Sequence, residues 1–489
     1  RLLLRLQQAQ GEFTTAAGIP PNLPFLQEIA GDRSALAVYD IGKLELLYIS
    51  HLESSRAIQS ALWQKRSQFE PRESAGKQFF VRTDSQSGRV VAFAVDGDML
   101  ILGTREDLVA GALSLLAGNK MAPGTEEAWY ANAVKASTAP GELRMVLHLS
   151  EIAKTPQFRT YWIQRNVTEM RQYESAVSDL RLSSATYREE RVLLPKAALD
   201  CSASTNDAVA VSNLIGFAPD SIGFYRANSA PSVEDALAAL ETKVLTPRLG
   251  PTPPSKLAPS AALTSGTVTK VGLDARIDVP PSNDLAAGAS DDALRKLLTA
   301  ANPRAILELH RSASTPDGVF VRLYSTLVLT SNTDWNADAV KSAIRNVVNP
   351  AVTTGGLGTE WKTVQTGTQQ YFELDGLYPV AIAVRGKYVF VSNDPETLAA
   401  TLSRVSSSGN SEPLLYAARF DHARERHSFA QLTSVVDKPS RTNAPGEPQF
   451  FSQNINSLSE MFSRVQSESL TSKCKAGNVQ QTVVYEWAQ

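Results

Sequence analysis

The chain has 489 residues, of which 43% are hydrophobic and 20% charged, and its formal net charge is -2. This length exceeds what one hydrophobic core usually supports, so we expect several domains of ordinary folded composition rather than general disorder. The small net charge speaks against nucleic acid as a partner, and no apolar run approaches the roughly 18 residues that a membrane-spanning helix needs.

The chain begins with a basic amphipathic stretch, residues 1–10, that lacks the apolar core and cleavage site of a signal peptide. Two interpretations stay open. The stretch is either the end of a helix whose membrane-embedded part lies upstream, or a helix packed on the protein. We treat residues 1–25 as an N-terminal segment because the prolines at 20, 21 and 24 cannot lie inside a helix.

Residues 26–205 follow as a first α+β module. Alternating apolar residues predict strands at 34–39, 44–49, 78–82, 91–95, 99–102, 141–149 and 188–194. Helical spacing predicts helices at 53–68, after Thr104, and at 158–180. The strand at 91–95 has one buried face, because Val91, Phe93 and Val95 alternate, and Gly97 forms the tight turn that follows it.

Residues 206–300 are a connecting region, and residues 301–489 are a second α+β module. Five prolines at 246–260 predict an extended linker there. Further strands are expected at 222–225, 268–277, 305–310, 319–329, 361–366, 370–374, 380–384, 388–391, 414–420 and 482–487. Helices are expected at 233–245, 291–300 and 335–348, the last capped by Asn332 or Thr333, and in the region after residue 420.

Residues 89–116 and 378–405 share one pattern of strand, turn, strand and helix. Without a gap, Val91, Ala92, Ala94, Val95, Gly97, Ala110, Leu113 and Ser114 match Val380, Ala381, Ala383, Val384, Gly386, Ala399, Leu402 and Ser403. We infer a tandem duplication of one module. Strands linked by tight turns predict mainly antiparallel sheets with helices packed on one face, which is the α+β class.

Catalytic motifs are missing, since the chain has no P-loop, HExxH, GxSxG or CxxC sequence. The densest titratable cluster runs from Asp421 to His427. Its two histidines are five residues apart and do not share a helical face, so we expect a solvated or interface segment. Asp96 and Asp98 flank the turn glycine, but Arg385 and Lys387 replace them in the second copy, which argues against paired catalytic carboxylates.

Three further features have plain structural interpretations. The glycines at 355–358 do not lie between a strand and a phosphate-binding helix and predict a turn. The sequon Asn166-Val167-Thr168 lies in a predicted helix, which makes it a coincidental match. Four aromatic residues could line a ligand pocket, although helical spacing favours the core: Trp129, Tyr161, Trp162 and Tyr173.

The chain has two cysteines, Cys201 and Cys474. Two cysteines so far apart form no metal cluster, and we expect neither a metal nor a cofactor. They either form a disulfide, as an oxidising compartment would allow, or remain as two free thiols.

The residues FRTYWIQRN at 158–166, the run Glu189-Glu190-Arg191-Val192 and the repeated hairpin-helix unit resemble uncharacterised bacterial envelope proteins with duplicated α+β domains. The resemblance implies an extracytoplasmic location, in the periplasm or at the cell surface, and an anchor or signal upstream of Arg1. It assigns no catalytic, cofactor or metal residues.

From these features we expect a non-enzymatic extracytoplasmic protein, tethered to a membrane, with a structural or accessory role in a larger assembly. Its expected partners are proteins of the envelope, with membrane contact through the N-terminal segment. The alternative is a binding module that holds a ligand, peptide or polysaccharide between the two repeats. An enzyme of unrecognised type is the third possibility.

Overall fold

The computed structural model describes residues 2–40, 42–119, 124–137, 139–154, 170–202, 205–245, 291–314, 321–352, 360–374, 379–405, 412–436 and 464–488. The chain forms two compact units, residues 1–128 and 129–489, called unit 1 and unit 2 below. Every strand pair in these ranges is antiparallel. The predicted class, α+β with mainly antiparallel sheets, is confirmed.

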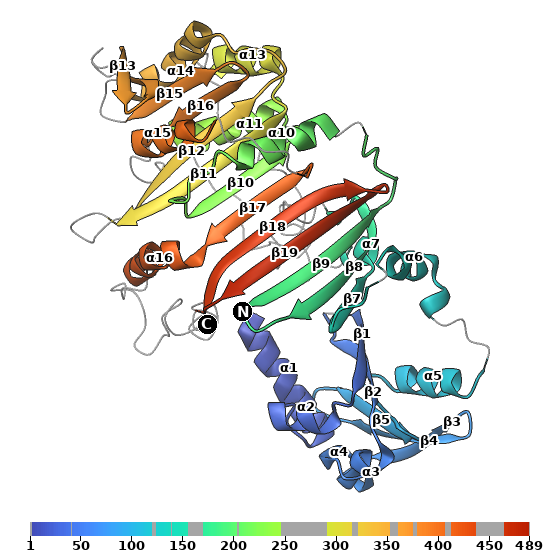
Figure 1. Cartoon of the computed structure of the whole chain (residues 1–489). Coiled ribbons are helices and arrows are strands. Elements are labelled where there is room, and N and C mark those ends of the chain that lie inside the picture. Colours follow the sequence, from blue (N-terminus) through green and yellow to red (C-terminus); the bar gives the residue numbers. More distant parts are fainter. Residues whose placement is uncertain are drawn as a thin grey trace, which may run out of the picture. The chain divides into compact units, whose positions relative to one another are not determined.

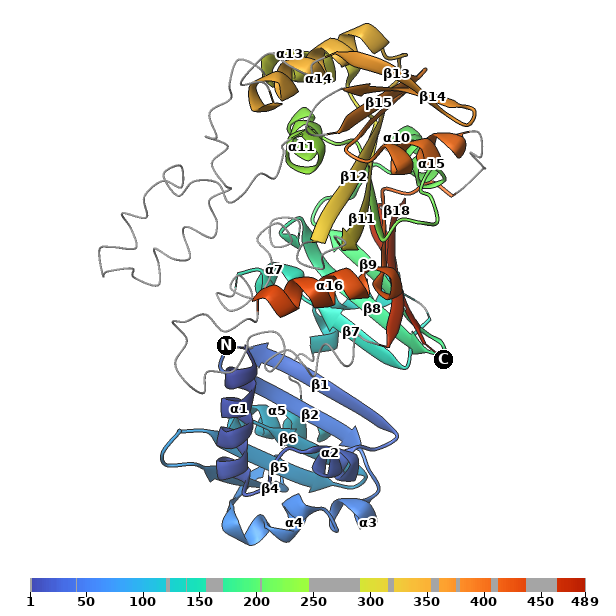
Figure 2. The same ribbon diagram turned by 90° about the vertical axis from the view of Figure 1, so that its left-hand side faces the viewer.

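Unit 1 contains one six-stranded sheet in the order β1-β2-β6-β5-β4-β3, with β1 at one edge (Figure 2). Its strands are β1 (Arg33–Asp40), β2 (Glu45–His51), β3 (Glu70–Ser74), β4 (Lys77–Thr83), β5 (Val90–Asp96) and β6 (Met99–Gly103). Its helices are α1 (Leu2–Ala17), α2 (Leu23–Ile29), α3 (Ser54–Ala57), α4 (Ala61–Gln64) and α5 (Glu106–Leu116), with 3-10 turns η1 (Arg66–Gln68) and η2 (Gly124–Glu126).

Helices cover both faces of this sheet. On one face Val91 and Phe93 pack with residues of α1, α2 and α4, and on the other Ala92 and Ala94 pack with α5. The expectation of helices on a single face, drawn from strands linked by tight turns, is therefore corrected, as is the expectation that only one face of the strand at 91–95 is buried. The small side chains between Val91 and Val95 are alanines, which are also fully buried and give the second helix room to approach.

Unit 2 is built on one thirteen-stranded sheet in the order β13-β14-β15-β16-β12-β11-β10-β17-β18-β19-β9-β8-β7 (Figure 1). Its strands are β7 (Leu143–Leu147), β8 (Tyr173–Leu182), β9 (Thr186–Pro195), β10 (Phe224–Ser229), β11 (Ala305–Ser314), β12 (Val321–Thr330), β13 (Trp361–Thr366), β14 (Gln369–Leu374), β15 (Val380–Arg385), β16 (Tyr388–Ser392), β17 (Tyr416–Asp421), β18 (Val465–Lys475) and β19 (Asn478–Trp487).

The helices of unit 2 are α6 (Ala128–Ala136), α7 (Leu149–Ile152), α10 (Thr205–Ile215), α11 (Val233–Ala239), the π-helical η3 (Leu240–Leu245), α13 (Asp291–Ala301), α14 (Ala337–Val352), α15 (Pro395–Ser403) and α16 (His422–Val436). The central strands again have two covered faces. Ile306 and Ile382 pack with α11, η3, α13 and α14, whereas Leu307 and Phe390 pack with α10 and α15.

The first six strands of each predicted module follow the same order. The order β1-β2-β6-β5-β4-β3 corresponds to β11-β12-β16-β15-β14-β13 in chain position. The turn glycines Gly97 and Gly386 have φ of 58° and 55°, which favours glycine over any residue with a Cβ. Duplication itself stays a prediction.

The compact units do not follow the predicted modules 26–205 and 301–489. Strands β7, β8 and β9 lie in the first module by sequence, but β9 pairs with β19 from Val479 to Glu486 and so joins the sheet of unit 2. The boundary between the compact units is set by which strands pair with each other, whereas the boundaries of the predicted modules are set by the repeated sequence pattern.

Several predicted elements differ from the structure. Residues 173–180 are not helical but lie in β8, and the expected helix 53–68 is broken into α3, α4 and η1. Thr104 does not cap α5; its hydroxyl instead accepts from Leu46 N and donates to Leu44 O. The caps expected at 332 or 333 are replaced by Asn336, which accepts from the backbone of α14. The linker 246–260 and the strand 268–277 lie outside the described residues.

Candidate functional site

A chain of polar side chains crosses three neighbouring strands in the middle of the unit 2 sheet. In the strand register Arg226 of β10 lies opposite Glu308 of β11, and His310 of β11 lies opposite Ser325 of β12. Directly opposed residues share a face, and Glu308 and His310 share theirs because they are two residues apart. The sheet therefore places all four side chains in one row.

The row is hydrogen-bonded from end to end. Arg226 Nη2 donates to Glu308 Oε1 at 2.5 Å, Glu308 Oε2 lies 3.4 Å from His310 Nε2, and His310 Nδ1 lies 2.9 Å from Ser325 Oγ. Phe224 stacks on the His310 ring with centroids 5.6 Å apart. Glu308, His310 and Ser325 are only 3%, 6% and 1% exposed, so the row belongs to the interior.

Glu308 is held in its charged form. Burial acts to raise the pKa of this carboxyl, but hydrogen bonding from His310 and the charge of Arg226 outweigh burial and lower the pKa to about 2. A buried carboxylate with a low pKa is one whose charge is compensated by its neighbours. The row therefore carries a charge-compensated ion pair next to the apolar residues Leu307 and Leu309 of β11, although Arg226 Nε is buried without a hydrogen-bond partner among the described residues.

Serine, histidine and glutamate in hydrogen-bonded order are the residue types of a nucleophilic triad. A triad needs a serine that substrate can reach, and at 1% exposure Ser325 is closed to solvent. Ser325 N is also held by Asn393 Oδ1 at 2.7 Å, which fixes this part of β12. The arrangement fits a structural tie between strands rather than a reaction centre.

This row was not predicted from the sequence. Glu308 and His310 interrupt the apolar run of β11 at a spacing of two, which is a detectable signal for paired side chains on a strand. The partners Arg226 and Ser325 come from other strands, and only the register reveals them.

A second buried ion pair lies at the β7 edge of unit 2. Asp179 of β8 accepts from Arg144 Nε at 2.7 Å and Nη2 at 2.9 Å, and also binds Ser137 and Gly141 N. Burial raises the pKa of Asp179, but these donors outweigh burial and the net pKa is lowered. The pair ties β7 to β8 and to the segment before β7.

The predicted polar cluster Asp421–His427 lies at the end of β17 and the start of α16. Glu425 turns inward, where it binds the backbone N and the hydroxyl of Ser312 and leaves no room for a side chain at Gly223. Asp421 accepts from Arg424 N at 2.9 Å, and His422 lies 3.8 Å from Glu468. The cluster anchors α16 on the sheet of unit 2.

Asp96 and Asp98 are engaged in separate structural contacts. Asp96 pairs with Lys77 at 2.6 Å, and Asp98 Oδ1 accepts from Ser54 N at 3.2 Å. Among the predicted aromatic residues, Trp129 stacks on His148 with centroids 4.3 Å apart, and Tyr173 begins β8. Tyr161, Trp162, the sequon at 166–168 and the glycines at 355–358 lie outside the described residues.

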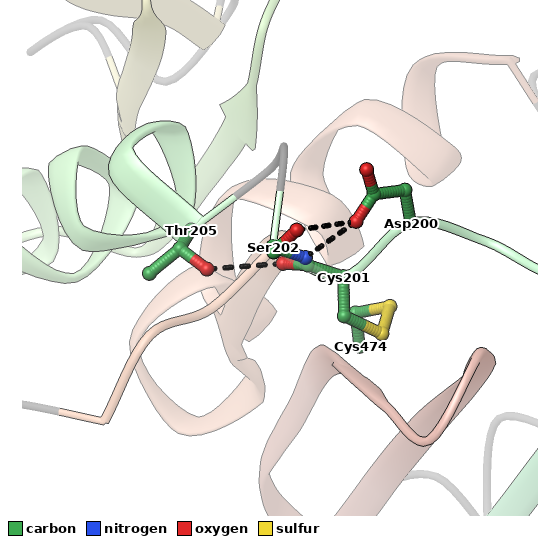
Figure 3. The surroundings of a disulfide bond; sticks show 5 residues. All are labelled: Asp200, Cys201, Ser202, Thr205 and Cys474. Carbon is green, nitrogen blue, oxygen red and sulfur yellow. Dashed lines mark hydrogen bonds between the residues drawn. A yellow bond between two sulfur atoms is a disulfide. The ribbon is translucent and has the colours of Figure 1, made fainter.

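Cys201 and Cys474 form a disulfide, so this one of the two alternatives is confirmed. It joins the segment after β9 to β18 across 273 residues of sequence, with Cα atoms 5.4 Å apart. Asp200 Oδ1 accepts from Ser202 N and Oγ, and Thr205 Oγ1 donates to Cys201 O (Figure 3). A disulfide indicates an oxidising, extracytoplasmic compartment.

Two shallow depressions lie on the described surface. One, of about 320 Å³, borders the disulfide and includes the Lys473–Glu412 ion pair of 2.7 Å. The other, of about 370 Å³, lies at the β3–β4 hairpin of unit 1 beside Arg72 and Gln78. Both are lined largely by groups that already have partners or face solvent, and neither gathers the convergent polar groups of a built ligand site.

Within the described ranges, no three histidine, cysteine or acidic side chains gather in a way that could hold a metal ion. In the same ranges, no helix combines the length and apolar character that crossing a membrane requires.

No family model and no curated protein matches this chain. Two crystal structures of TP0453 were found by similarity of shape. Crystal form IV is 9% identical with a TM-score of 0.19 and covers 53% of this chain and 74% of its own. Crystal form III is 7% identical with a TM-score of 0.20 and covers 55% and 91%. Scores this low carry no argument about fold or function.

Proposed function

We propose that this chain is a non-enzymatic accessory protein of the bacterial cell envelope, tethered to a membrane and working within a protein assembly. The Cys201–Cys474 disulfide supports the extracytoplasmic part of the proposal. The periplasm or cell surface, and the tether through the basic N-terminal helix α1, are supported by the resemblance to envelope proteins and by the sequence of residues 1–10.

The observation that carries the assembly role is the exposed apolar edge of the unit 2 sheet. Among the described strands, β7 ends this sheet and pairs on one side only, with β8. Leu143 and Met145 share one face of β7 and are 51% and 37% exposed. An edge strand offers a row of unpaired N–H and C=O groups, and apolar side chains beside it add affinity for a partner strand.

Natural edge strands are commonly blunted by lysine, proline or inward charge. Strand β7 has one charged residue, Arg144, and its charge is compensated by Asp179. This edge is consequently open to protein contact, which is the property that an accessory subunit requires.

The proposal is tested on the protein expressed from its natural gene. Chemical cross-linking in cells, followed by pull-down from detergent-solubilised membranes, is expected to yield a cross-linked partner in the membrane fraction. Thiol labelling before and after reduction is expected to show Cys201 and Cys474 oxidised. Leu143→Lys with Met145→Lys is expected to reduce the cross-linked species at least tenfold, because two charges would face the partner.

Leu323→Lys is the matched control, since Leu323 is a similarly exposed leucine, at 40%, on β12 of the same sheet. It is expected to leave the cross-linked species unchanged. Recovery of the protein only as a reduced, soluble, uncross-linked monomer would contradict the proposal. The alternative of a ligand-, peptide- or polysaccharide-binding module stays a prediction, with no feature of the described residues that favours it.

A further inference from the structure

Strand β1 is the most exposed strand of unit 1. Among the described strands it pairs only with β2, and from Arg33 to Tyr39 every residue is exposed. The apolar side chains among them include Leu36, Val38 and Tyr39, at 59%, 53% and 58% exposure. Leu36 and Val38 share a face because they are two residues apart.

At the opposite edge of the same sheet, β3 carries residues of the kinds that commonly prevent further strand pairing. Strand β3 has the sequence Glu-Pro-Arg-Glu-Ser, with a proline that removes a backbone donor and three charged side chains. Strand β1 has no proline or lysine, and its charged residues, Arg33 and Asp40, stand at its two ends. One edge of the unit 1 sheet is thus closed to further strands, and the other is open.

The edge in the corresponding position of unit 2 accepts a strand. Strand β11 occupies the place in its set of six that β1 occupies in unit 1. Its outer side is paired antiparallel with β10, from Ala305 opposite Ser229 to His310 opposite Phe224. In unit 2 a further strand, β10, therefore pairs with the outer side of this position. In unit 1 no described strand pairs with the outer side of β1.

We propose that β1 pairs antiparallel with β1 of a second copy of this chain, so that the two unit 1 sheets join across a two-fold axis. This inference rests on the proposed assembly role and names one partner within it. A two-fold interface brings the same patch of both copies together, so the patch must complement itself. The sequence of β1 meets that requirement.

The outward N–H and C=O groups of a strand recur at every second residue, so two identical edges can bond only when the axis passes through a residue. With the axis at Leu36, the two Leu36 side chains meet, and Val38 of each copy lies opposite Ser34 of the other. Four aliphatic side chains that are exposed in the single chain then form one apolar cluster.

The charges of β1 complement each other in this register. Strand β1 has a bulge between Val38 and Asp40, which moves Asp40 into the position that Tyr39 would take in a regular strand. Arg33 of each copy consequently lies opposite Asp40 of the other, and the two side chains of each pair point to the same face of the joined sheet. Two such pairs close the two ends of the interface, and opposite charges across strands favour pairing. This complementarity singles out a second copy over an unrelated strand.

The decisive experiment uses a cysteine on the predicted axis. In antiparallel pairs, opposed Cα atoms are about 4.5–5.5 Å apart, which lies within disulfide reach. Leu36→Cys is expected to give a reducible covalent dimer at micromolar concentration under mild oxidation. Leu116→Cys is the matched control, because Leu116 is a 49% exposed leucine in α5 of the same unit. It is expected to cross-link at least tenfold more slowly. The native cysteines give no dimer, because Cys201 and Cys474 are bonded to each other within one chain.

Sedimentation provides the second measurement. The natural chain is expected to dimerise, and Leu36→Lys is expected to raise the dissociation constant at least tenfold, whereas Leu116→Lys leaves it unchanged. Circular dichroism checks that each variant is folded, and Val38→Lys repeats the test if Leu36→Lys is not. Slow cross-linking of Leu36→Cys, equal to that of Leu116→Cys, would overturn the proposal. So would a natural chain that stays monomeric, or a dimer that survives both lysine variants.

The outcome separates this inference from the proposed function. A chain that is monomeric when purified, yet loses a different protein from membrane pull-downs when Leu36 is replaced by lysine, would refute the second copy as occupant and keep the assembly role. A β1 dimer that forms while no envelope partner is recovered would support the second copy as occupant and refute the envelope assembly role.

Discussion

Replacing Glu308 by glutamine tests whether the buried row in unit 2 stabilises the fold. Glutamine keeps the size of the side chain and resembles the protonated carboxyl, so Glu308→Gln removes the charge and little else. The carboxyl is 3% exposed and lies between Arg226 and His310, so its loss leaves a cation with no compensating charge beside it.

The magnitude follows from the pKa of Glu308, which falls from an ordinary 4.5 to about 2 in the folded chain. Each factor of ten in an acid constant is worth about 1.4 kcal/mol, so the charged form contributes about 3 kcal/mol to folding at neutral pH. Because the folded pKa is depressed, this contribution is complete above pH 4.5. It is lost as the pH falls through the folded pKa, near 2.

The assay is urea unfolding at pH 7, 5 and 3, followed by circular dichroism and by tryptophan fluorescence, to which Trp335 and Trp361 of unit 2 contribute. We expect Glu308→Gln to lower the free energy of unfolding of unit 2 by about 3 kcal/mol at pH 7, and by less than half of that at pH 3. The matched control is Glu190→Gln. Glu190 pairs with Arg181 and Arg188, but its side chain is 43% exposed, so we expect less than about 1 kcal/mol.

Two results would refute this reasoning. One is a Glu308→Gln chain as stable as the natural one at pH 7, which would mean that burial cancels the attraction of Arg226 and His310. The other is a loss of the same size at pH 7 and pH 3, which would trace the effect to packing rather than to charge.

Two further predictions concern the disulfide and the turn glycines. Cys201→Ser with Cys474→Ser is expected to lower the free energy of unfolding of unit 2 by about 2–5 kcal/mol, because the bond closes a loop of 273 residues. Dithiothreitol should destabilise the natural chain but not this variant. Gly97→Ala and Gly386→Ala are each expected to cost about 1–2 kcal/mol, in unit 1 and unit 2 respectively, because both positions have positive φ. Thermal melting checks the disulfide and the glycine predictions. As a contrast, Gly11→Ala lies in the middle of α1, where the backbone is helical, and should instead stabilise unit 1 by up to about 1 kcal/mol.

The sequence predicted the parts of the fold that local chemistry decides. Both hairpins around Gly97 and Gly386 were found because a turn glycine between alternating apolar residues is a local signal. Strand β8 was missed. Tyr173, Val177 and Leu180 are spaced like one helix face, but the strand is buried on both sides, so its true period of two is hidden.

The candidate site was harder to predict, for a different physical reason. Glu308 and His310 are neighbours on one strand, but Arg226 lies far earlier in the chain and Ser325 lies across a hairpin. Their meeting depends on strand register, which is set by packing over the whole sheet. The pairing of Cys201 with Cys474 has the same origin, since it requires β9 to lie beside β19, the hairpin partner of β18.

The two sets of six strands differ most clearly at their first edge. They share the strand order, the turn glycines and two covered faces, all of which a stable sheet requires. At β11 the edge is covered by β10, and along β1 the corresponding edge exposes Leu36 and Val38. Exposed aliphatic side chains are common on protein surfaces, but beside a strand edge that no described strand pairs with, they favour the addition of a further strand. The second copy proposed for β1 would close this edge as β10 closes that of β11.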